Sequence, residues 1–157
     1  MKTRFLLVLF CVILFHVSYA QNPSHKNQGP QPINFNSNTE ASLSNDELVK
    51  LNEVYGDALK TEILDRPIRI LTMKEILRNR VVLREISDPI KQKPCPNLSE
   101  IPLFDVFVST LKRDVVFNPN SFNPLKYDFK YHMPGFQLIR VDNTNYFIII
   151  KPQHYNN

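Results

Sequence analysis

The sequence predicts an α+β domain: two N-terminal helices packed on a C-terminal three-stranded antiparallel β-meander, preceded by a disordered tether. Two capping motifs open segments of helical apolar spacing in the first half, and aromatic or β-branched residues alternate with polar ones in the last third. Of 157 residues, 43% are hydrophobic and 22% charged, with 12 Pro and 3 Gly. These proportions suit one small core and exclude a collagen-like chain, a long coiled coil, a disulfide-dense miniprotein and a wholly disordered chain.

Residues 1–20 have the features of a secretory signal peptide. Two basic residues precede an apolar run over 5–15, which is too short for a bilayer span of about 20 residues. Ser18 and Ala20 supply the small side chains of a cleavage site. An uncleaved anchor helix is the alternative, and it is disfavoured because no further apolar run extends it. We therefore expect a secreted or periplasmic protein, cleaved near Ala20, with no transmembrane segment afterwards.

Cleavage changes the charge and the cysteine count. It leaves 137 residues and, because Lys2 and Arg4 leave without an acid, it lowers the formal net charge from +4 to +2. The basic balance is then weak support for nucleic acid, and no nucleic-acid partner is expected. Cys95 becomes the sole cysteine, so no intramolecular disulfide forms. It is a candidate intermolecular thiol, although an unreactive thiol is the favoured interpretation.

The segment 21–42 is predicted to be a disordered linker. It is rich in Asn, Gln, Ser, Pro and Gly, and Ile33, Phe35 and Ala41 are its only apolar residues apart from proline. Such a segment buries too little surface to offset the entropy of ordering it. The single α+β domain is therefore expected to span 43–152, followed by a tail over 153–157.

The first helix is predicted to begin at a capping box and to run to about Leu64. Ser44 and Glu47 form the S-x-x-E pattern, and the helix ends before Pro67. Gly56 is expected to lie off the apolar face and to weaken the helix slightly. The apolar face consists of Leu48, Leu51, Tyr55, Ala58, Leu59 and Ile63.

A second capping box, Thr72 with Glu75, is predicted to open a shorter helix. Met73, Ile76 and Leu77 would face the core. The β-branched residues over 81–86 permit either a continued helix or a strand, and a proline-rich connector follows over 91–102. The segment 103–117 is expected to be buried, and its apolar spacing fits both a strand and a short helix.

The C-terminal third is predicted to hold three strands. Tyr127, Phe129 and Tyr131 alternate with polar residues over 126–132, which indicates a strand with one wet face. A turn at Pro134-Gly135 is expected to use glycine for positive φ. A hairpin over 136–142 and 145–151 would then pair Val141 with Tyr146, Ile139 with Ile148 and Leu138 with Ile149. Both of its faces are apolar, so it should be central and covered on both sides.

Two segments of this region, Phe122-Asn123-Pro124-Leu125-Lys126-Tyr127-Asp128-Phe129 and Arg140-Val141-Asp142-Asn143-Thr144-Asn145-Tyr146-Phe147-Ile148-Ile149-Ile150, resemble uncharacterised small secreted proteins of Bacteroidota. The resemblance covers about the last third of the chain. It implies a compartment and a lineage, and it implies no activity and no functional residue.

One cluster of charge is a candidate binding site. Between 66 and 84 the chain holds six basic residues against one acid, Glu75, so this segment is a candidate for binding an anionic polymer or headgroup. The favoured alternative is the solvated side of the second helix. The candidate anion-binding residues are Arg66, Arg69, Lys74, Arg78, Arg80 and Arg84.

No other pattern specifies a site. No catalytic, cofactor-binding or metal-binding residues are predicted: the histidines, His25, His132 and His154, are widely separated, and Asp128 lies too far from His132 along one strand to share a small ion with it. The aromatic stripe of 127–131 fits sugar stacking, but it is better explained as a core face. Asn97-Leu98-Ser99 is a glycosylation sequon only in a eukaryotic source.

The favoured function is an exported, non-enzymatic binding or structural module for an unknown protein or envelope polymer. The signal peptide, the linker and the lack of catalytic spacing support this expectation. The alternative is a small secreted hydrolase with an unrecognised acid–base pair. No cofactor is expected.

Overall fold

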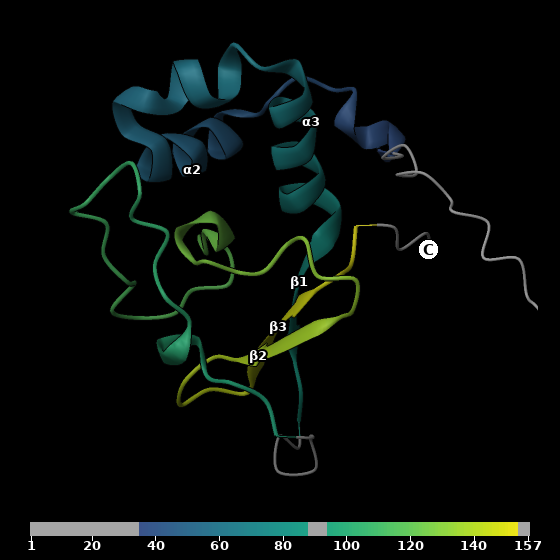
Figure 1. The fold of residues 1–157 in the computed structure, drawn as a ribbon. Helices are drawn as coiled ribbons and strands as arrows, with labels where there is room; N and C mark the ends of the chain where they lie inside the picture. Colours follow the sequence, from purple (N-terminus) through teal and green to yellow (C-terminus); the bar gives the residue numbers. More distant parts are fainter. Residues whose placement is uncertain (1–34, 88–93, 154–157) are drawn as a thin grey trace, which may run out of the picture. The chain divides into compact units, whose positions relative to one another are not determined.

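The structure is a computed structural model that describes residues 35–87 and 94–153 (Figure 1). The predicted signal peptide, most of the predicted linker and all but the first residue of the predicted tail lie outside the described residues. The described chain forms two helical segments and a three-stranded antiparallel sheet, which confirms the predicted fold class. No helix in these two ranges is long and apolar enough to cross a membrane.

The first helix, α2 (Asn45–Tyr55), begins at the predicted capping box. The Ser44 hydroxyl accepts from the Glu47 amide at 3.2 Å, and the Glu47 carboxylate accepts from the Ser44 amide at 2.8 Å. Gly56 then adopts a φ of 49°, which favours glycine because a Cβ is strained there. Gly56 therefore ends α2 instead of weakening its interior. Short helical turns carry the segment on to Leu64, where it was predicted to end.

The second helix, α3 (Pro67–Glu75), starts earlier than predicted. Pro67 occupies the first turn, where the missing amide hydrogen is not needed. The predicted start at Thr72 is wrong: Thr72 lies inside the helix, and its hydroxyl donates to the Ile68 carbonyl at 2.9 Å. A wider turn, Ile76–Arg80, continues α3 directly into the sheet. Met73, Ile76 and Leu77 pack in the core, as predicted.

The sheet consists of β1 (Val81–Glu85), β2 (Gln137–Arg140) and β3 (Tyr146–Ile150), in the order β1-β3-β2. The hairpin register is as predicted, with Leu138 opposite Ile149 and Ile139 opposite Ile148. The Val141 amide donates to the Tyr146 carbonyl at 3.0 Å. Figure 1 shows α3 leading straight into β1, so the segment 81–86, left open between helix and strand, supplies a strand.

The strand predicted over 126–132 is not formed. Among the described residues it forms a single isolated bridge, between Leu103 and Tyr127. The amides of Phe129 and Tyr131 donate to carbonyls two residues earlier, each at 2.8 Å, so these backbone groups bond within the segment. The side chains still alternate, which explains the misleading pattern. Gly135 also lacks the positive φ that the sequence predicted.

The segment 103–117 contains neither a helix nor a strand of the sheet. It runs through turns and exposes three valines: Val106 is 70% exposed, Val115 fully and Val116 79%. The expectation that this segment is buried is therefore wrong at these positions. Its Arg113 side chain donates to the carbonyls of Leu98 and Ile101, which ties the segment to the preceding connector.

The core has two hydrophobic clusters, and residues 122–131 contribute to both. A sheet cluster contains Ile139, Ile148, Tyr127 and Phe129, whereas a helix cluster contains Leu51, Val54, Ile63, Ile76 and Leu125. Tyr131 and Val81 contact both clusters. The aromatic stripe therefore faces the core, as predicted. The opposite face of the hairpin is covered only in part: Phe147 is buried there, whereas Leu138 and Ile149 remain half-buried.

Residues 36–42, here called the N-terminal segment, pack against α3 although the sequence assigned them to the linker. Lys74 is buried and donates to the Thr39 carbonyl at 3.0 Å. The Asn36 side chain donates to the Glu75 carboxylate at 2.8 Å. Arg78 donates to carbonyls of this segment. The domain consequently starts before residue 43.

Candidate functional site

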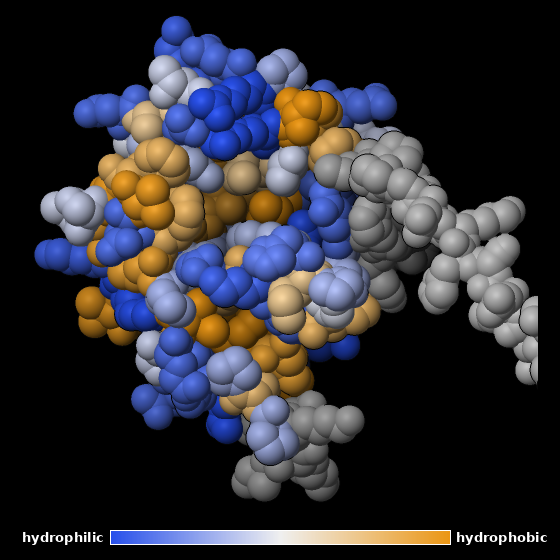
Figure 2. Space-filling model, in the orientation of Figure 1, coloured by the Kyte–Doolittle hydropathy of each residue, from blue (hydrophilic) through white to orange (hydrophobic). Residues whose placement is uncertain are grey.

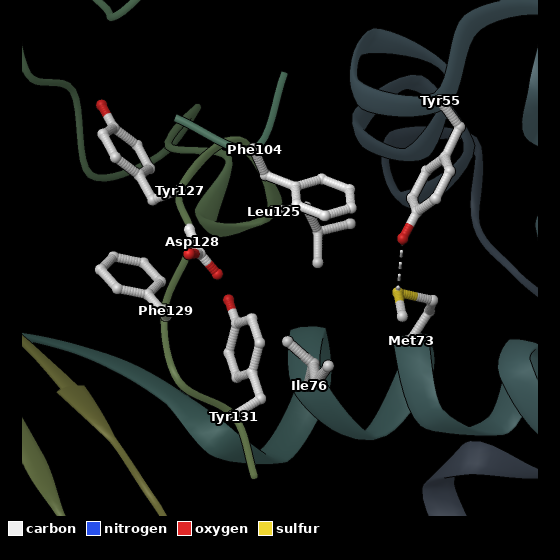
Figure 3. Close-up of a pocket in the computed structure, with 9 residues that line it drawn as sticks. All are labelled: Tyr55, Met73, Ile76, Phe104, Leu125, Tyr127, Asp128, Phe129 and Tyr131. Atoms are coloured by element: carbon white, nitrogen blue, oxygen red, sulfur yellow. Dashed lines mark hydrogen bonds between the residues drawn. The ribbon is translucent and has the colours of Figure 1, made fainter. Parts of the chain in front are cut away.

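A small cavity lies where the two helical segments meet residues 122–131. Its volume is about 120 Å³ and aromatic side chains dominate its walls (Figure 3). Figure 2 shows hydrophobic side chains gathered around a hollow in the middle of the visible face. We call this site the aromatic cavity. Its lining residues are Tyr55, Met73, Ile76, Phe104, Leu125, Tyr127, Asp128, Phe129 and Tyr131.

Four parts of the chain position these side chains. Tyr55 is the last residue of α2, and Met73 and Ile76 lie about one turn apart on α3 and its continuation. Leu125 belongs to a short 3-10 turn that the Asn123 side chain caps by accepting from the Leu125 amide at 3.1 Å. The cavity thus depends on contacts between segments far apart in sequence.

Two backbone hydrogen bonds hold the fourth wall in place. The Phe104 amide donates to the Lys126 carbonyl at 2.8 Å, and the Asp128 amide donates to the Pro102 carbonyl at 2.9 Å. These bonds place the Phe104 ring against α2, with its centroid 6.1 Å from that of Tyr55. The ring of Phe107 lies 5.1 Å from Tyr55 and extends the aromatic surface outward.

Two of the three tyrosines that line the cavity, Tyr55 and Tyr131, are neutral hydrogen-bonding groups. The Tyr131 hydroxyl donates to the Pro124 carbonyl at 3.1 Å, and the Tyr55 hydroxyl lies 3.9 Å from the Met73 sulfur. Burial raises the pKa of Tyr131 far above its ordinary value, although the nearby Arg80 opposes this. Burial also raises the pKa of Tyr55. Neither phenol therefore supplies a phenolate at neutral pH.

Asp128 is the one carboxylate in the cavity wall. Its Oδ2 atom accepts from the Lys130 ammonium at 2.5 Å, and both side chains are about half exposed. A pair so exposed contributes about 0–1 kcal/mol and is readily exchanged. No described residue donates to the other oxygen, Oδ1. Figure 3 shows the carboxylate on the same side of the cavity as the Tyr131 hydroxyl.

Chemically, this arrangement is suited to holding a small apolar or cationic group. The volume lies below the roughly 300–1,000 Å³ of sites that enclose a whole drug-sized ligand. Its rings offer apolar contact and electron-rich faces, and Asp128 offers a single negative charge. The cavity therefore fits one terminal group of a ligand better than a complete ligand.

Two larger hollows have fewer ring faces and more polar groups. One of about 280 Å³ lies beside Lys50 and Leu83, and another of about 300 Å³ lies beside Arg113 and Asp142. Ser99 donates to the Asp142 carboxylate through its hydroxyl at 2.5 Å and its amide at 2.9 Å. Burial raises the pKa of Asp142, but these bonds outweigh it, so the net shift is downward. This serine–carboxylate pair joins the 3-10 turn Leu98–Glu100 to the chain just after β2.

The six candidate anion-binding residues do not form one patch. Arg66 and Arg69 both pair with Glu62, at 3.3 and 2.6 Å. Arg84 is exposed on β1, in the strand that follows the helical segment. These three account for the solvated part of the predicted cluster.

The other three cations bond within the domain. Lys74 and Arg80 are buried, and Arg80 donates to the carbonyls of Tyr131 and Lys151. Burial lowers the pKa of Arg80 from its ordinary value. Arg78 pairs with Glu47 at 2.6 Å. Lys74, Arg78 and Arg80 bind backbone carbonyls and a carboxylate within the domain. They therefore match neither the predicted anion-binding site nor the predicted solvated side of the helix.

The remaining predicted residues are separate from the cavity. Cys95 is a free, half-buried thiol, and its proposed intermolecular bond stays a prediction. His132 is exposed, whereas His25 and His154 lie outside the described residues. Within 35–87 and 94–153, no group of three His, Cys, Asp or Glu side chains converges as a metal site.

The sequence predicted some of the residues that line the cavity, but it did not indicate a cavity. Tyr127, Phe129 and Tyr131 were identified as a core stripe, and they form one wall. Tyr55 was assigned only to the apolar face of its helix, and Phe104 only to a buried segment. No local spacing connects these residues with Asp128, so the site had no sequence signal beyond its aromatic content.

Comparisons with known protein families, with curated proteins and with solved structures found no match. The proposed function therefore depends on the geometry of the aromatic cavity.

Proposed function

We propose that this protein is an exported, non-enzymatic binding module for a protein or an envelope component. In this proposal the aromatic cavity receives a small terminal group of the ligand. The observation that carries the proposal is a partly open cavity of about 120 Å³ whose walls are mainly aromatic. Proteins commonly place such concave apolar surfaces, with a few polar groups, where they bind ligands.

The surroundings of the cavity support a larger contact surface around it. Phe107 contacts both Tyr55 and Phe104 and is 37% exposed, and the neighbouring Val106 is mostly exposed. Exposed aromatic and aliphatic side chains beside a cavity are typical of interaction surfaces. A ligand anchored in the cavity would cover Phe107 and Val106 as well.

The polar groups of the cavity support binding over catalysis. Burial keeps the phenols of Tyr55 and Tyr131 neutral at neutral pH, and the Tyr131 hydroxyl already donates to a carbonyl. A general base needs a pKa near the working pH and access to the substrate proton. The two phenols lack that pKa, so they serve as wall and hydrogen-bonding groups.

The test is a ligand screen by saturation-transfer NMR on the chain from residue 21 onward. The screen uses small aromatic, aliphatic, cationic and anionic compounds, and Met73→Phe serves as a cavity-filled variant whose fold is checked by thermal unfolding. We expect bound compounds to lose their signal in Met73→Phe. Binding that is unchanged in this variant would contradict the proposal. Turnover of a polysaccharide, peptide or nucleic acid in a separate activity assay would contradict it as well.

A further inference from the structure

We infer that the aromatic cavity binds a small quaternary ammonium group, held against the faces of Tyr55 and Phe104 and beside the carboxylate of Asp128. This inference rests on the proposed binding function and assigns the chemical class of the ligand. It combines three features of the cavity: its ring faces, its single charge and its mostly apolar walls.

The ring faces provide the first argument. A cation within about 6 Å of an aromatic centroid is attracted by the negative face of the ring. The centroids of Tyr55 and Phe104 are 6.1 Å apart with their planes inclined at 57°, so the two rings form adjoining walls. Figure 3 shows both rings on one side of the cavity, with Tyr131 on the other.

Tyr131 contributes shape more than attraction. The guanidinium of Arg80 already lies 5.6 Å from the Tyr131 ring centroid, and a second cation at that ring would be repelled by it. Arg80 itself is not a lining residue, and it donates to carbonyls elsewhere. The attraction is therefore assigned to Tyr55 and Phe104.

The charge of Asp128 provides the second argument. It is the only charged side chain among the described residues that line the cavity, so these residues favour a cation over an anion. Its partner Lys130 is half exposed and contacts only the Oδ2 atom. Because an exposed pair of this kind is weak, a cation in the cavity competes with Lys130 for Asp128 on nearly equal terms.

The apolar walls explain why the cation is methylated. A primary ammonium carries three N–H donors, and each donor that loses water needs an acceptor. Among the described lining side chains, strong acceptors are limited to the Asp128 carboxylate and the phenol oxygens, and the other side chains are hydrocarbon or thioether. A quaternary ammonium has no N–H group, and its methyl groups suit apolar walls. The cavity therefore suits a trimethylammonium group.

The test measures affinity for choline and tetramethylammonium by NMR titration, with 3,3-dimethyl-1-butanol as the neutral isostere of choline. We expect choline to bind about threefold to thirtyfold more tightly than the isostere, which corresponds to one cation–π site. Equal affinity for the two compounds would overturn the inference and leave the binding module intact. If neither these compounds nor any in the screen binds, both proposals fail.

Single-residue variants test which side chains of the cavity bind choline. Asp128→Asn and Phe104→Leu should each weaken choline binding severalfold, and Phe104→Leu should leave the isostere nearly unaffected because its volume is largely kept. Lys130→Gln, the matched control on the same surface, should strengthen choline binding because it frees Asp128. Choline affinity that stays unchanged in Asp128→Asn and Phe104→Leu would overturn the assignment.

The trimethylammonium group can come from a soluble compound or from a lipid headgroup. Cosedimentation with phosphatidylcholine vesicles, against phosphatidylglycerol vesicles of the same size, distinguishes the two sources. Binding to phosphatidylcholine that free choline displaces identifies a headgroup, and binding to free choline alone identifies a soluble ligand. Stronger binding to phosphatidylglycerol, together with no displacement by choline, would contradict the inference.

Discussion

Replacing Arg78 with Met should destabilise the domain and release its N-terminal segment. The guanidinium donates to both oxygens of Glu47, at 2.6 and 2.7 Å, and to three carbonyls of the N-terminal segment. Met keeps most of the side-chain stem and removes the charge and all five donors. The variant therefore separates this polar network from the packing of the stem.

The expected loss of stability follows from how deeply the ion pair between Arg78 and Glu47 is buried. The side chains of Arg78 and Glu47 are only 17% and 10% exposed. Removing one partner of a buried pair costs about 3–5 kcal/mol, because the other charge stays buried without compensation. Glu47 still accepts from Ser44. We therefore expect the lower end, about 3 kcal/mol, against a total stability of about 5–15 kcal/mol for an ordinary domain.

The same pair predicts a pH dependence. Hydrogen bonds from Arg78 lower the pKa of Glu47 below its ordinary value of 4.5, although burial opposes them. A group whose pKa is lowered by folding stabilises the domain above its unfolded pKa, and this contribution disappears as the pH falls through the folded value. The difference in unfolding free energy between wild type and Arg78→Met should therefore be largest at neutral pH and shrink below about pH 4.5.

Urea unfolding at several pH values measures both effects, and hydrogen exchange at residues 36–42 reports release of the N-terminal segment. Arg69→Gln is the matched control, because its pair with Glu62 is about half exposed on the arginine side and should contribute about 0–1 kcal/mol. A loss in Arg78→Met no greater than in this control would refute the reasoning. So would a difference that is equal at pH 3 and pH 7.

Three further predictions concern the core, the end of α2 and the start of the domain. Ile148→Ala should cost about 2–5 kcal/mol of stability because the Ile148 side chain is fully buried. Ile149→Ala should cost less because the Ile149 side chain is half-buried. Equal losses of stability in denaturant melts would contradict the assigned faces. Gly56→Ala should cost about 1–3 kcal/mol, since φ is 49° and the new Cβ would lie 3.1 Å from Val108; an unchanged melting temperature would argue against this backbone. A chain that starts at Leu43 should melt lower than one that starts at residue 21, because Lys74 and Arg78 lose their carbonyl acceptors, and identical curves would show that the N-terminal segment contributes nothing.

The elements that the sequence predicted correctly are those determined by residues close together in the chain. The Ser44–Glu47 box is complete within four residues, and the hairpin register follows from a short turn and matched apolar residues such as Ile139 and Ile148. The Thr72–Glu75 pattern failed because the same residue types also occur inside a helix, where the Thr72 hydroxyl bonds back to Ile68. A capping motif is therefore decisive only when nothing upstream can already be helical.

Features that depend on distant segments escaped prediction. The alternation of Tyr127, Phe129 and Tyr131 resembles a strand that would pair with β2 through the turn at Pro134-Gly135. The backbone of this segment instead bonds within itself, the Arg140 amide of β2 donates to the Pro96 carbonyl, and the third strand of the sheet, β1, pairs with β3. The basic residues resembled a surface site because their acceptors, carbonyls of residues 38–42 among them, lie about 35–40 positions away in sequence. The aromatic cavity needed four separate segments to meet.

The strand order has a consequence for how the chain folds. The central strand, β3, is the last of the three in sequence, so β1 and β2 lack their shared partner until residues 146–150 are available. Pairing β1 with β3 closes a loop of about 60 residues, which is entropically costly and slow to form. A nascent chain of this topology remains without its sheet until residues 146–150 have been synthesised. That delay is compatible with the proposed export, because a polypeptide that must cross a membrane unfolded benefits from a sheet that cannot form before its central strand is made.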